Sequence, residues 1–328
     1  MLKISILTAT YNRVKLLPRL YDSIVRNLED NIQTEWFIMD DGSMDNTQEV
    51  VSKFKEYPNL RIKYYFQENS GKMKALNNLM KRVTGDLIVE CDSDDFFADN
   101  SFKLINEEYE KCKTDKELYA ICFLKFDQDG NNIGKEFKYE ETTMFDLYFR
   151  EGENGEKALV YFSDVRKQYE YKLEKNEKFG TEARLHHELD EKYKIKCINE
   201  PIMICEYQKD GYTKNIKKIF KENPYGYYKY FKEILEKDMS GVNFGKRLYV
   251  IKHYILFSYL TKKKLDIKNV KNIINKVLII LLYFPGMAKS RKFWYFFYNV
   301  CKNSSIIVKC RKKLTMWVKK WTKTFYFQ

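Results

Sequence analysis

Three aspartates crowd the end of the stretch DLIVECDSDD, residues 86–95. Asp92, Asp94 and Asp95 directly follow an apolar run that is typical of a buried strand. Like charges this close raise one another's pKa and cost free energy unless a cation lies between them. A divalent metal ion with oxygen ligands meets that need. The alternative is a solvated acidic turn that closes the strand, and the motif by itself favours neither.

Polar loops also follow three other apolar runs in this part of the chain. The alternation of short apolar runs with amphipathic stretches predicts a parallel sheet with helices between its strands. Strands are expected at 3–9, 35–39, 61–66 and 86–91, with helices at 14–27, after Asp45 and at 72–83. Ligands bind at the carboxyl ends of strands in such sheets. The loops TATYNR, DDGS, QENSGK and DSDD should therefore meet at one crevice.

The later chain has a mixed pattern and then a helical one. Strands are expected near 118–126, 157–163 and 201–207, with a helix at 181–193. From residue 214 the chain is mostly helical in pattern, aromatic and rich in lysine, without a Pro/Gly/Ser linker. We therefore expect an α/β domain over 1–213 and a helical region over 214–328.

Two of the loops carry groups suited to a nucleotide. A carboxylate in DDGS, Asp40 or Asp41, can accept hydrogen bonds from a nucleobase or a ribose, although capping of the next helix is an equal alternative. Lys72 stands at a helix N-terminus, which suits a diphosphate, whereas a solvated lysine is the commoner role. Asp92 and Asp94, at i and i+2 of an extended segment, point the same way. One could hold a ribose hydroxyl and the other a metal ion.

The ordered set TATYN, DDGS, ENSGKMKALN and DSDD resembles the family 2 glycosyltransferases with the GT-A fold. The resemblance is strong over roughly the first 100 residues and weak to about 213, so it implies a nucleotide-sugar half and then an acceptor half. It implies a nucleotide-sugar donor, usually a UDP-sugar, a Mg²⁺ or Mn²⁺ ion, and inversion at the anomeric carbon by direct displacement. The chain is similar to bacterial hexosyl- or N-acetylhexosaminyl-transferases of capsule, O-antigen and related surface polysaccharide assembly.

The resemblance also implies roles for single residues. Thr8, Tyr11 and Asp41 would line the nucleoside pocket, with Asp40 in support. In the DXD motif, Asp92 would meet the ribose or the metal ion and Asp94 would bind the metal ion. The last aspartate, Asp95, would hold the loop.

An inverting transfer needs a base for the acceptor hydroxyl's proton. The resemblance implies a carboxylate at a helix start, which Glu182 offers after Thr181, where family members often have an acidic pair. Glu188 and Asp190 are the rivals, farther along a helix whose pattern faces solvent. A second pair, His186 and His187, points about 100° apart on a helix and cannot serve one metal ion together.

The positive charge is concentrated at the end of the chain. Fourteen Lys/Arg and no Asp/Glu lie in 267–328, so the net charge of +13 belongs to this tail. Residues 306–325 have the pattern of a basic amphipathic helix with tryptophans, which favours an anionic membrane surface. The apolar runs 277–284 and 293–300 fall short of the ~20 residues of a membrane span. We expect a peripheral protein on the cytoplasmic face of the membrane with a lipid-linked acceptor; a helical subdomain and a true span are the alternatives.

Other classes fit less well. The seven cysteines form no CxxC pair and are odd in number, which suggests neither a zinc site nor a disulfide framework. The N-terminus lacks the pattern of a signal peptide. A nucleotidyltransferase would also use carboxylates on an α/β sheet, but TATYNR contains no glycine. A nucleic-acid-binding protein would use the basic tail, but the nearly neutral first 266 residues argue against it.

Overall fold

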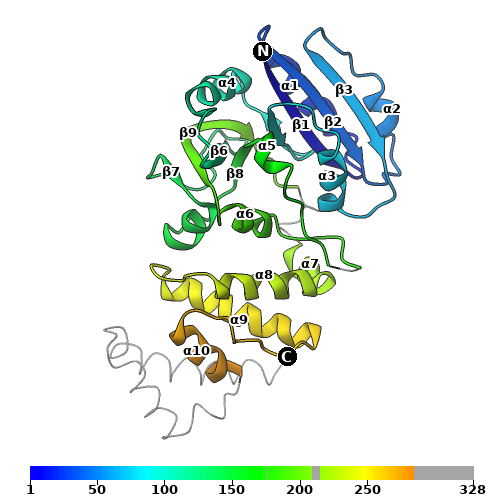
Figure 1. The fold of residues 1–328 in the computed structure, drawn as a ribbon. Coiled ribbons are helices and arrows are strands. Elements are labelled where there is room, and N and C mark those ends of the chain that lie inside the picture. The colour runs from blue at the N-terminus through cyan, green and yellow to red at the C-terminus, as the bar shows by residue number, and fades with distance from the viewer. Residues whose placement is uncertain (175, 209–214, 284–328) are drawn as a thin grey trace, which may run out of the picture. The chain divides into compact units, whose positions relative to one another are not determined.

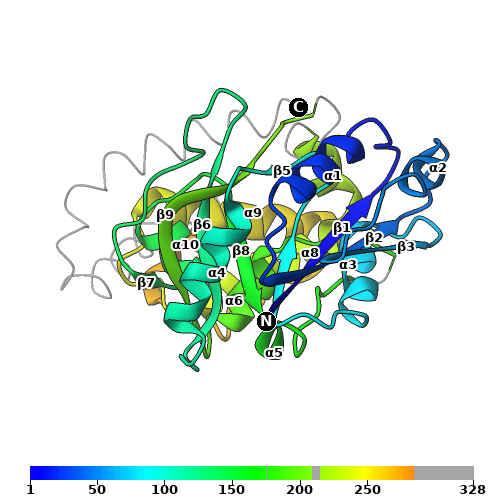
Figure 2. The same ribbon diagram turned by 90° about the horizontal axis from the view of Figure 1, so that it is seen from above.

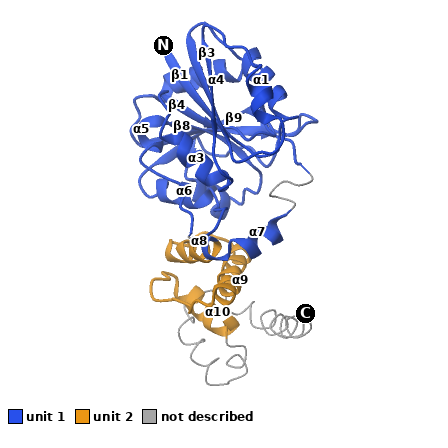
Figure 3. Cartoon of the chain, turned by 90° about the vertical axis from the view of Figure 1, so that its right-hand side faces the viewer, with its two compact units in different colours: residues 1–226 blue, residues 227–328 orange. Residues whose placement is uncertain are grey.

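The chain forms two compact units that divide after Gly226 (Figure 3). This computed structural model describes residues 1–174, 176–208 and 215–283. The first unit is an α/β domain, and the described residues of the second are helical. The change of composition near residue 214 lies before this division.

The first unit is built from short strands and helices that alternate along the chain (Figure 1). The strands are β1 (Leu2–Thr10), β2 (Ile32–Asp40), β3 (Leu60–Phe66), β4 (Leu87–Glu90), β5 (Phe96–Phe97), β6 (Leu118–Phe126), β7 (Glu141–Thr142), β8 (Lys157–Phe162) and β9 (Lys194–Ile204). The helices are α1 (Leu17–Arg26), α2 (Thr47–Val51), α3 (Lys72–Met80), α4 (Ser101–Cys112), η1 (Asp146–Arg150), α5 (Ser163–Arg166), α6 (Ala183–Leu189) and α7 (Ile216–Glu222).

One nine-stranded sheet runs through this unit. Its order is β3-β2-β1-β4-β8-β6-β9-β5, and β7 pairs with β9. Strands β1 to β4 are parallel to one another, and β1, β2 and β3 lie side by side (Figure 2). β8 is antiparallel to both β4 and β6, whereas β6 and β9 are parallel. The mostly parallel α/β sheet predicted from the sequence is thus confirmed.

Alternating residues of the central strands supply two separate cores. In β2, Trp36 and Ile38 pack on the side of α1, while Phe37 and Met39 pack on the side of α3. This alternation follows from the two-residue period of a strand. Helices cover both faces, as a parallel sheet requires, and the carboxyl ends of β1, β2 and β4 stay free for loops.

Several predicted elements have other bounds in the structure. The helix expected at 14–27 begins only at Leu17, with a proline in its first turn. Proline is tolerated there because the first N–H groups of a helix lack intrahelical partners. The strand expected at 201–207 is longer and begins at Lys194. The helix expected at 181–193 spans only Ala183–Leu189.

The second unit continues from α8 (Pro224–Glu236) into α9 (Phe244–Thr261) and α10 (Ile273–Tyr283). Aromatic rings hold α8 to α9: the Phe257 ring stacks on Tyr227 at 5.3 Å and on Phe231 at 5.7 Å between centroids. No helix of the described ranges is long and apolar enough to cross a membrane. The predicted amphipathic helix at 306–325 and the run at 293–300 lie outside the described residues.

Candidate active site

The loop after β4 places its three aspartates in three different environments. The N–H of Asp95 donates to the carbonyl of Asp92 at 3.0 Å and closes a tight turn. Asp95 is buried, and its carboxylate contacts the ammonium of Lys125 from β6 at 2.7 Å. This ion pair anchors the loop to the sheet, the role expected for Asp95.

Lys72, at the start of α3, links the loop after β4 to the segment before α6. Its ammonium lies 2.6 Å from Asp92 and 2.9 Å from Glu182, which stands just before α6. Both carboxylates remain accessible, with side-chain exposures of 44% and 43%. The charge of Lys72 lowers the pKa of Glu182 to about 2. The structure therefore brings together three residues that the sequence assigned to separate motifs.

Asp94 differs from Asp92 and Asp95 because its carboxylate has no cationic partner among the described residues. No lysine or arginine side chain of the described ranges pairs with its carboxylate, and the Arg19 guanidinium instead donates to its backbone carbonyl at 2.9 Å. Burial, Asp92 and Asp95 together raise the pKa of Asp94 to about 6. A cation between Asp92 and Asp94 would relieve this repulsion, and carboxylate oxygens are what Mg²⁺ and Mn²⁺ prefer. The residues present thus fit a divalent ion.

The aspartates after β2 are occupied by protein donors. Asp41 accepts hydrogen bonds from the N–H groups of Ser70 and Gly71, both at 2.8 Å. Asp40 accepts from the N–H of Ser43 and from the hydroxyl of Tyr64, both at 2.7 Å. In this structure both carboxylates hold the loops after β2 and β3, and their roles toward a nucleotide stay predictions.

Thr8 is a core residue in this structure. Its side chain is fully buried, and its hydroxyl accepts a hydrogen bond from Trp36 Nε1 at 3.0 Å. The Thr8 hydroxyl is therefore engaged within the core, and a direct contact of this side chain with a nucleoside stays a prediction. Tyr11, in contrast, is 47% exposed in the loop after β1 and can contact a ligand.

The structure explains why a glycine, Gly71, stands directly before α3. Its φ is +96°, a backbone conformation that side chains oppose. A Cβ there would lie 1.8 Å from the carbonyl oxygen of Lys178. The segment before Glu182 therefore packs directly against the start of α3, which holds Lys72 and Glu182 within reach of each other.

Comparison with known proteins identifies the family. Residues 5–175, more than half of the chain, match the family model described as glycosyl transferase family 2. This chain is a family 2 glycosyltransferase.

Individual relatives agree with this membership. An uncharacterised glycosyltransferase of Mycoplasma genitalium is 29% identical over 130 residues, which is 38% of this chain and 44% of the relative. The first relatives are thus matched over less than half of their length. The structure of residues 1–349 of Staphylococcus aureus TarS with UDP-GlcNAc has a TM-score of 0.55 at 15% identity, covering 85% of this chain and 78% of that one. A mannosyltransferase from Pyrobaculum calidifontis with GDP-Man and Mn²⁺ reaches 0.51 at 15% identity over 89% and 82%. These structures show a shared GT-A fold.

Glu188 and Asp190, the two alternative candidates for the general base, contact other residues. The carboxylate of Asp190 accepts from the backbone N–H groups of Met144 and Phe145, at 3.1 and 2.8 Å. Glu188 pairs with Lys172 at 2.7 Å. Neither carboxylate contacts Lys72. Of the three candidates for the base, Glu182 alone therefore lies in the cluster that Lys72 forms with Asp92.

The two histidines have core roles in this glycosyltransferase. Tyr161 and His186 share a hydrogen bond of 2.9 Å between hydroxyl and Nε2, and burial lowers the pKa of His186 to about 4. The His187 ring packs edge-on against Phe145 and Phe149.

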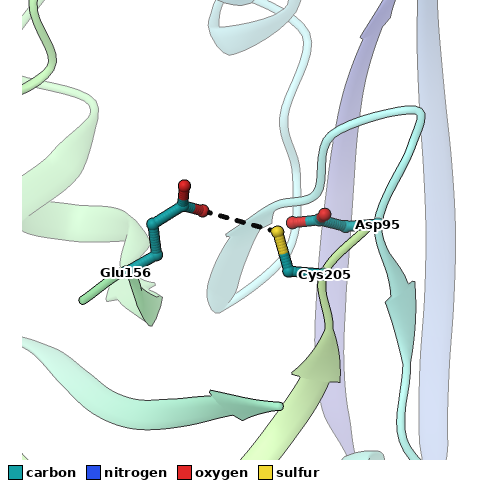
Figure 4. Close-up of side chains that lie close together, drawn as sticks. All are labelled: Asp95, Glu156 and Cys205. Atoms are coloured by element: carbon teal, nitrogen blue, oxygen red, sulfur yellow. Dashed lines mark hydrogen bonds between the residues drawn. The ribbon is translucent and has the colours of Figure 1, made fainter. Parts of the chain in front are cut away.

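A second cluster of titratable side chains includes Asp95, the last aspartate of the loop after β4 (residues 92–95, the DXD loop). Oxygen and sulfur atoms of Asp95, Glu156 and Cys205 lie within 4.8 Å of one another (Figure 4). The ammonium of Lys125 contacts Asp95 at 2.7 Å and Glu156 at 3.6 Å, so a cation already neutralises this group. A metal ion would have to displace this buried lysine. We therefore assign the group to the support of the DXD loop.

Sequence reasoning missed Lys125 and its partner Glu156. A single lysine near the end of the apolar run LYAICFLKF was the available signal, because a charge in a buried strand needs a partner. It also missed Arg166, a fully buried arginine that donates to Glu90 at 2.8 Å. Glu90 ends β4, so this pair fixes the strand that carries the DXD loop.

Proposed function

We propose that this glycosyltransferase transfers a hexosyl or N-acetylhexosaminyl group from a UDP-sugar to a glycan hydroxyl with inversion. The observation that carries the proposal is the cluster of Lys72, Asp92 and Glu182 beside Asp94. It supplies a cation for a diphosphate, carboxylates for a divalent ion and one further carboxylate for a proton.

Each residue has a role in this scheme. Asp94 and Asp92 would hold Mg²⁺ or Mn²⁺, which would neutralise charge on the donor diphosphate. Lys72 would turn from the carboxylates to the diphosphate, because an ammonium at a helix start suits phosphate oxygens. Tyr11 would contact the nucleoside, while Asp41, Asp40 and Thr8 would hold the loops around it.

Glu182 would act as the general base. With Lys72 at 2.9 Å its pKa of about 2 is too low for a base at neutral pH. Transfer of Lys72 to the diphosphate would remove that charge and raise the pKa. The acceptor oxygen would then attack C1 while the bond from C1 to the phosphate oxygen breaks. The proton of the acceptor hydroxyl would pass to Glu182, and UDP would leave. A single displacement of this kind inverts the configuration at C1.

We further propose that the acceptor is lipid-linked, in surface polysaccharide or capsule synthesis. Residues 267–328 would bind the anionic cytoplasmic face of the plasma (inner) membrane, peripherally, through their fourteen basic residues. The relative TarS, named a poly(ribitol-phosphate) β-N-acetylglucosaminyltransferase, is 28% identical over 103 residues, 31% of this chain and 18% of TarS. Its name gives TarS a polymeric acceptor, poly(ribitol-phosphate), which supports a polymeric acceptor for this chain as well.

A screen of nucleotide-sugars tests the proposal. The full chain is incubated with UDP-, GDP- and dTDP-sugars, each with Mn²⁺, Mg²⁺ or EDTA, and release of the nucleotide is measured. We expect hydrolysis of a UDP-sugar that requires the metal ion, and NMR of a transfer product should show the opposite anomeric configuration. Equal hydrolysis in EDTA, or a product with retained configuration, would contradict the mechanism.

A further inference from the structure

A cavity of about 530 Å³, open to solvent and lined mainly by polar and charged residues, lies between α3 and residues 170–174 and 176–178. The helix contributes its outer face to it, because Lys74, Asn77, Asn78 and Lys81 recur at the spacing of one helical side. The opposite side of α3 packs Met73 and Leu76 into the core. The size is that of a ligand pocket, for which 300–1,000 Å³ is the usual range.

The wall opposite α3 is held in place at both ends. Asn77 donates to the carbonyl of Tyr171 and accepts from its N–H, both at 2.9 Å. At the other end, Lys178 donates to Asn69 Oδ1 at 2.8 Å, and its carbonyl packs against Gly71. The cavity is the space that these two attachments leave between them.

Three lysines and three glutamates line the cavity, so its formal charge is balanced, but the two kinds of group differ in their partners. Two of its acidic groups are already engaged: Glu174 pairs with Arg184 at 3.4 Å, and Glu177 accepts from the backbone N–H groups of residues 225 and 226. Within the described ranges neither Lys74 nor Lys81 forms an ion pair.

The third ammonium of the wall, on Lys178, contacts only an amide oxygen among its described partners. These three exposed ammonium groups face Glu170 as the one acidic side chain of the lining that has no described partner. Ammonium groups thus outnumber carboxylates among the lining side chains that are left to contact a ligand, which favours an anionic ligand.

The cavity also shares two segments with the candidate active site. Asn69 and Ser70 line it and lead directly to Lys72, while Lys178 precedes Glu182 by one short stretch. Lys74 and Lys81 lie seven residues apart, about 10 Å along the helix axis. This spacing suits an extended chain that carries several charges better than a single ion.

We propose that this cavity binds the anionic part of an acceptor chain, a glycan that bears phosphate or carboxylate groups. The proposal rests on the glycosyltransferase function proposed above and adds a charge preference to its acceptor. The remaining polar groups, among them the Asn78 amide, would accept or donate hydrogen bonds to sugar hydroxyls.

Hydrogen–deuterium exchange of the full chain tests the cavity locally, so binding by the basic tail does not interfere. The probes are tripolyphosphate, tetrasialic acid and neutral maltotetraose, with UDP and Mn²⁺ in excess to fill the donor site. We expect the anionic probes to slow exchange of amides in 169–178. In the double variant Lys74→Ala/Lys81→Ala the protecting concentration should rise about tenfold, the effect of two lost surface charge contacts.

A matched control removes two lysines from α4, in the variant Lys103→Ala/Lys111→Ala, and should leave the protection unchanged. Protection by only one anionic probe would identify the preferred group, phosphate or carboxylate. Equal protection by maltotetraose, an unchanged titration in the α3 variant or an equal loss in the control would overturn the proposal. Nucleotide-sugar hydrolysis, measured on the same protein preparations with Mn²⁺ but without added UDP, should be normal in both variants, and its absence from the wild type would instead count against the proposed function.

Discussion

The ammonium of Lys72 lies 2.9 Å from the carboxylate of Glu182, although 110 residues separate them in the chain. The contact places the proposed diphosphate ligand and the proposed base in one cluster, in which Lys72 also pairs with Asp92. While the pair exists, Glu182 is held ionised but is a poor acceptor of protons. Donor binding and base activation would therefore be coupled through one lysine.

Replacement of the base should separate binding from chemistry. In Glu182→Gln we expect UDP affinity to stay within a few fold and transfer to fall by roughly 10²-fold or more, the scale of lost general-base catalysis. Titration calorimetry with UDP and a transfer assay measure the two quantities. Glu188→Gln is the control, because its carboxylate pairs with Lys172 instead. Near-normal transfer by Glu182→Gln would exclude Glu182 as the base.

Asp94 should be needed for the metal ion but not for the fold. Asp94→Asn removes one of three crowded carboxylates, so the melting temperature of the metal-free protein should stay level or rise. Metal-dependent binding of UDP should be lost in the same variant. Thermal denaturation and calorimetry with and without Mn²⁺ test both statements. Unchanged Mn²⁺ dependence would mean that Asp94 is not a ligand.

The buried pair of Lys125 and Asp95 should matter for stability. Lys125→Met leaves a buried carboxylate without a partner, which costs about 3–5 kcal/mol in unfolding free energy. Urea denaturation measures the loss. The double variant Lys125→Met/Asp95→Asn should recover most of it, because no uncompensated charge remains. A single variant as stable as the wild type would show that the pair contributes little.

Glu35 should make stability depend on acid pH. Burial raises its pKa, but hydrogen bonds from Ser5 and Thr84 and the nearby Lys3 outweigh burial and lower it from 4.5 to about 2. A carboxyl group whose pKa is lower in the folded than in the unfolded chain stabilises the fold at pH values above its unfolded-state pKa. This contribution to stability is lost as the pH falls toward the folded-state pKa of about 2. Glu35→Gln should therefore cost about 3 kcal/mol at pH 7 and much less near pH 2.

Urea denaturation of Glu35→Gln at pH 7 and at pH 3 measures this change. The exposed Glu136→Gln serves as its control and should match the wild type at both pH values. A constant difference between Glu35→Gln and the wild type at both pH values would contradict the assigned titration.

Truncation after Lys302 tests the membrane proposal. The shortened chain should lose flotation with anionic liposomes and keep donor hydrolysis, because every residue assigned to chemistry lies before residue 214. Binding of the full chain should weaken with salt, since the Debye length is only about 8 Å at physiological ionic strength. Equal flotation of both chains, or aggregation of the shortened one, would contradict a membrane role for the tail.

Much of the fold could be predicted because its signals are local. Short apolar runs indicated β1, β2, β3 and β6, and the bounds of β6 agree with the expected 118–126. The parallel arrangement followed from the alternation of these runs with helices. The strands β5 and β7 carry no such signal, because two residues are too few for an apolar run.

The sequence by itself determined which side chains stand at the carboxyl ends of the strands, and therefore that Asp92 and Asp94 lie at the same edge of the sheet as Asp40 and Asp41. Strand direction and loop position are local properties, so the residue types in order were sufficient. Burial at the rim is not local: Thr8 lies in the same motif as Tyr11, yet only Tyr11 is exposed, because Trp36 of the neighbouring strand covers Thr8.

Only the tertiary structure decided which charges meet. Lys72 with Glu182 and Lys125 with Asp95 join segments that are 110 and 30 residues apart. Their contacts depend on the order of strands in the sheet and on the path of the chain around α3. That order is fixed by packing energy summed over the whole domain, which no short stretch of sequence contains.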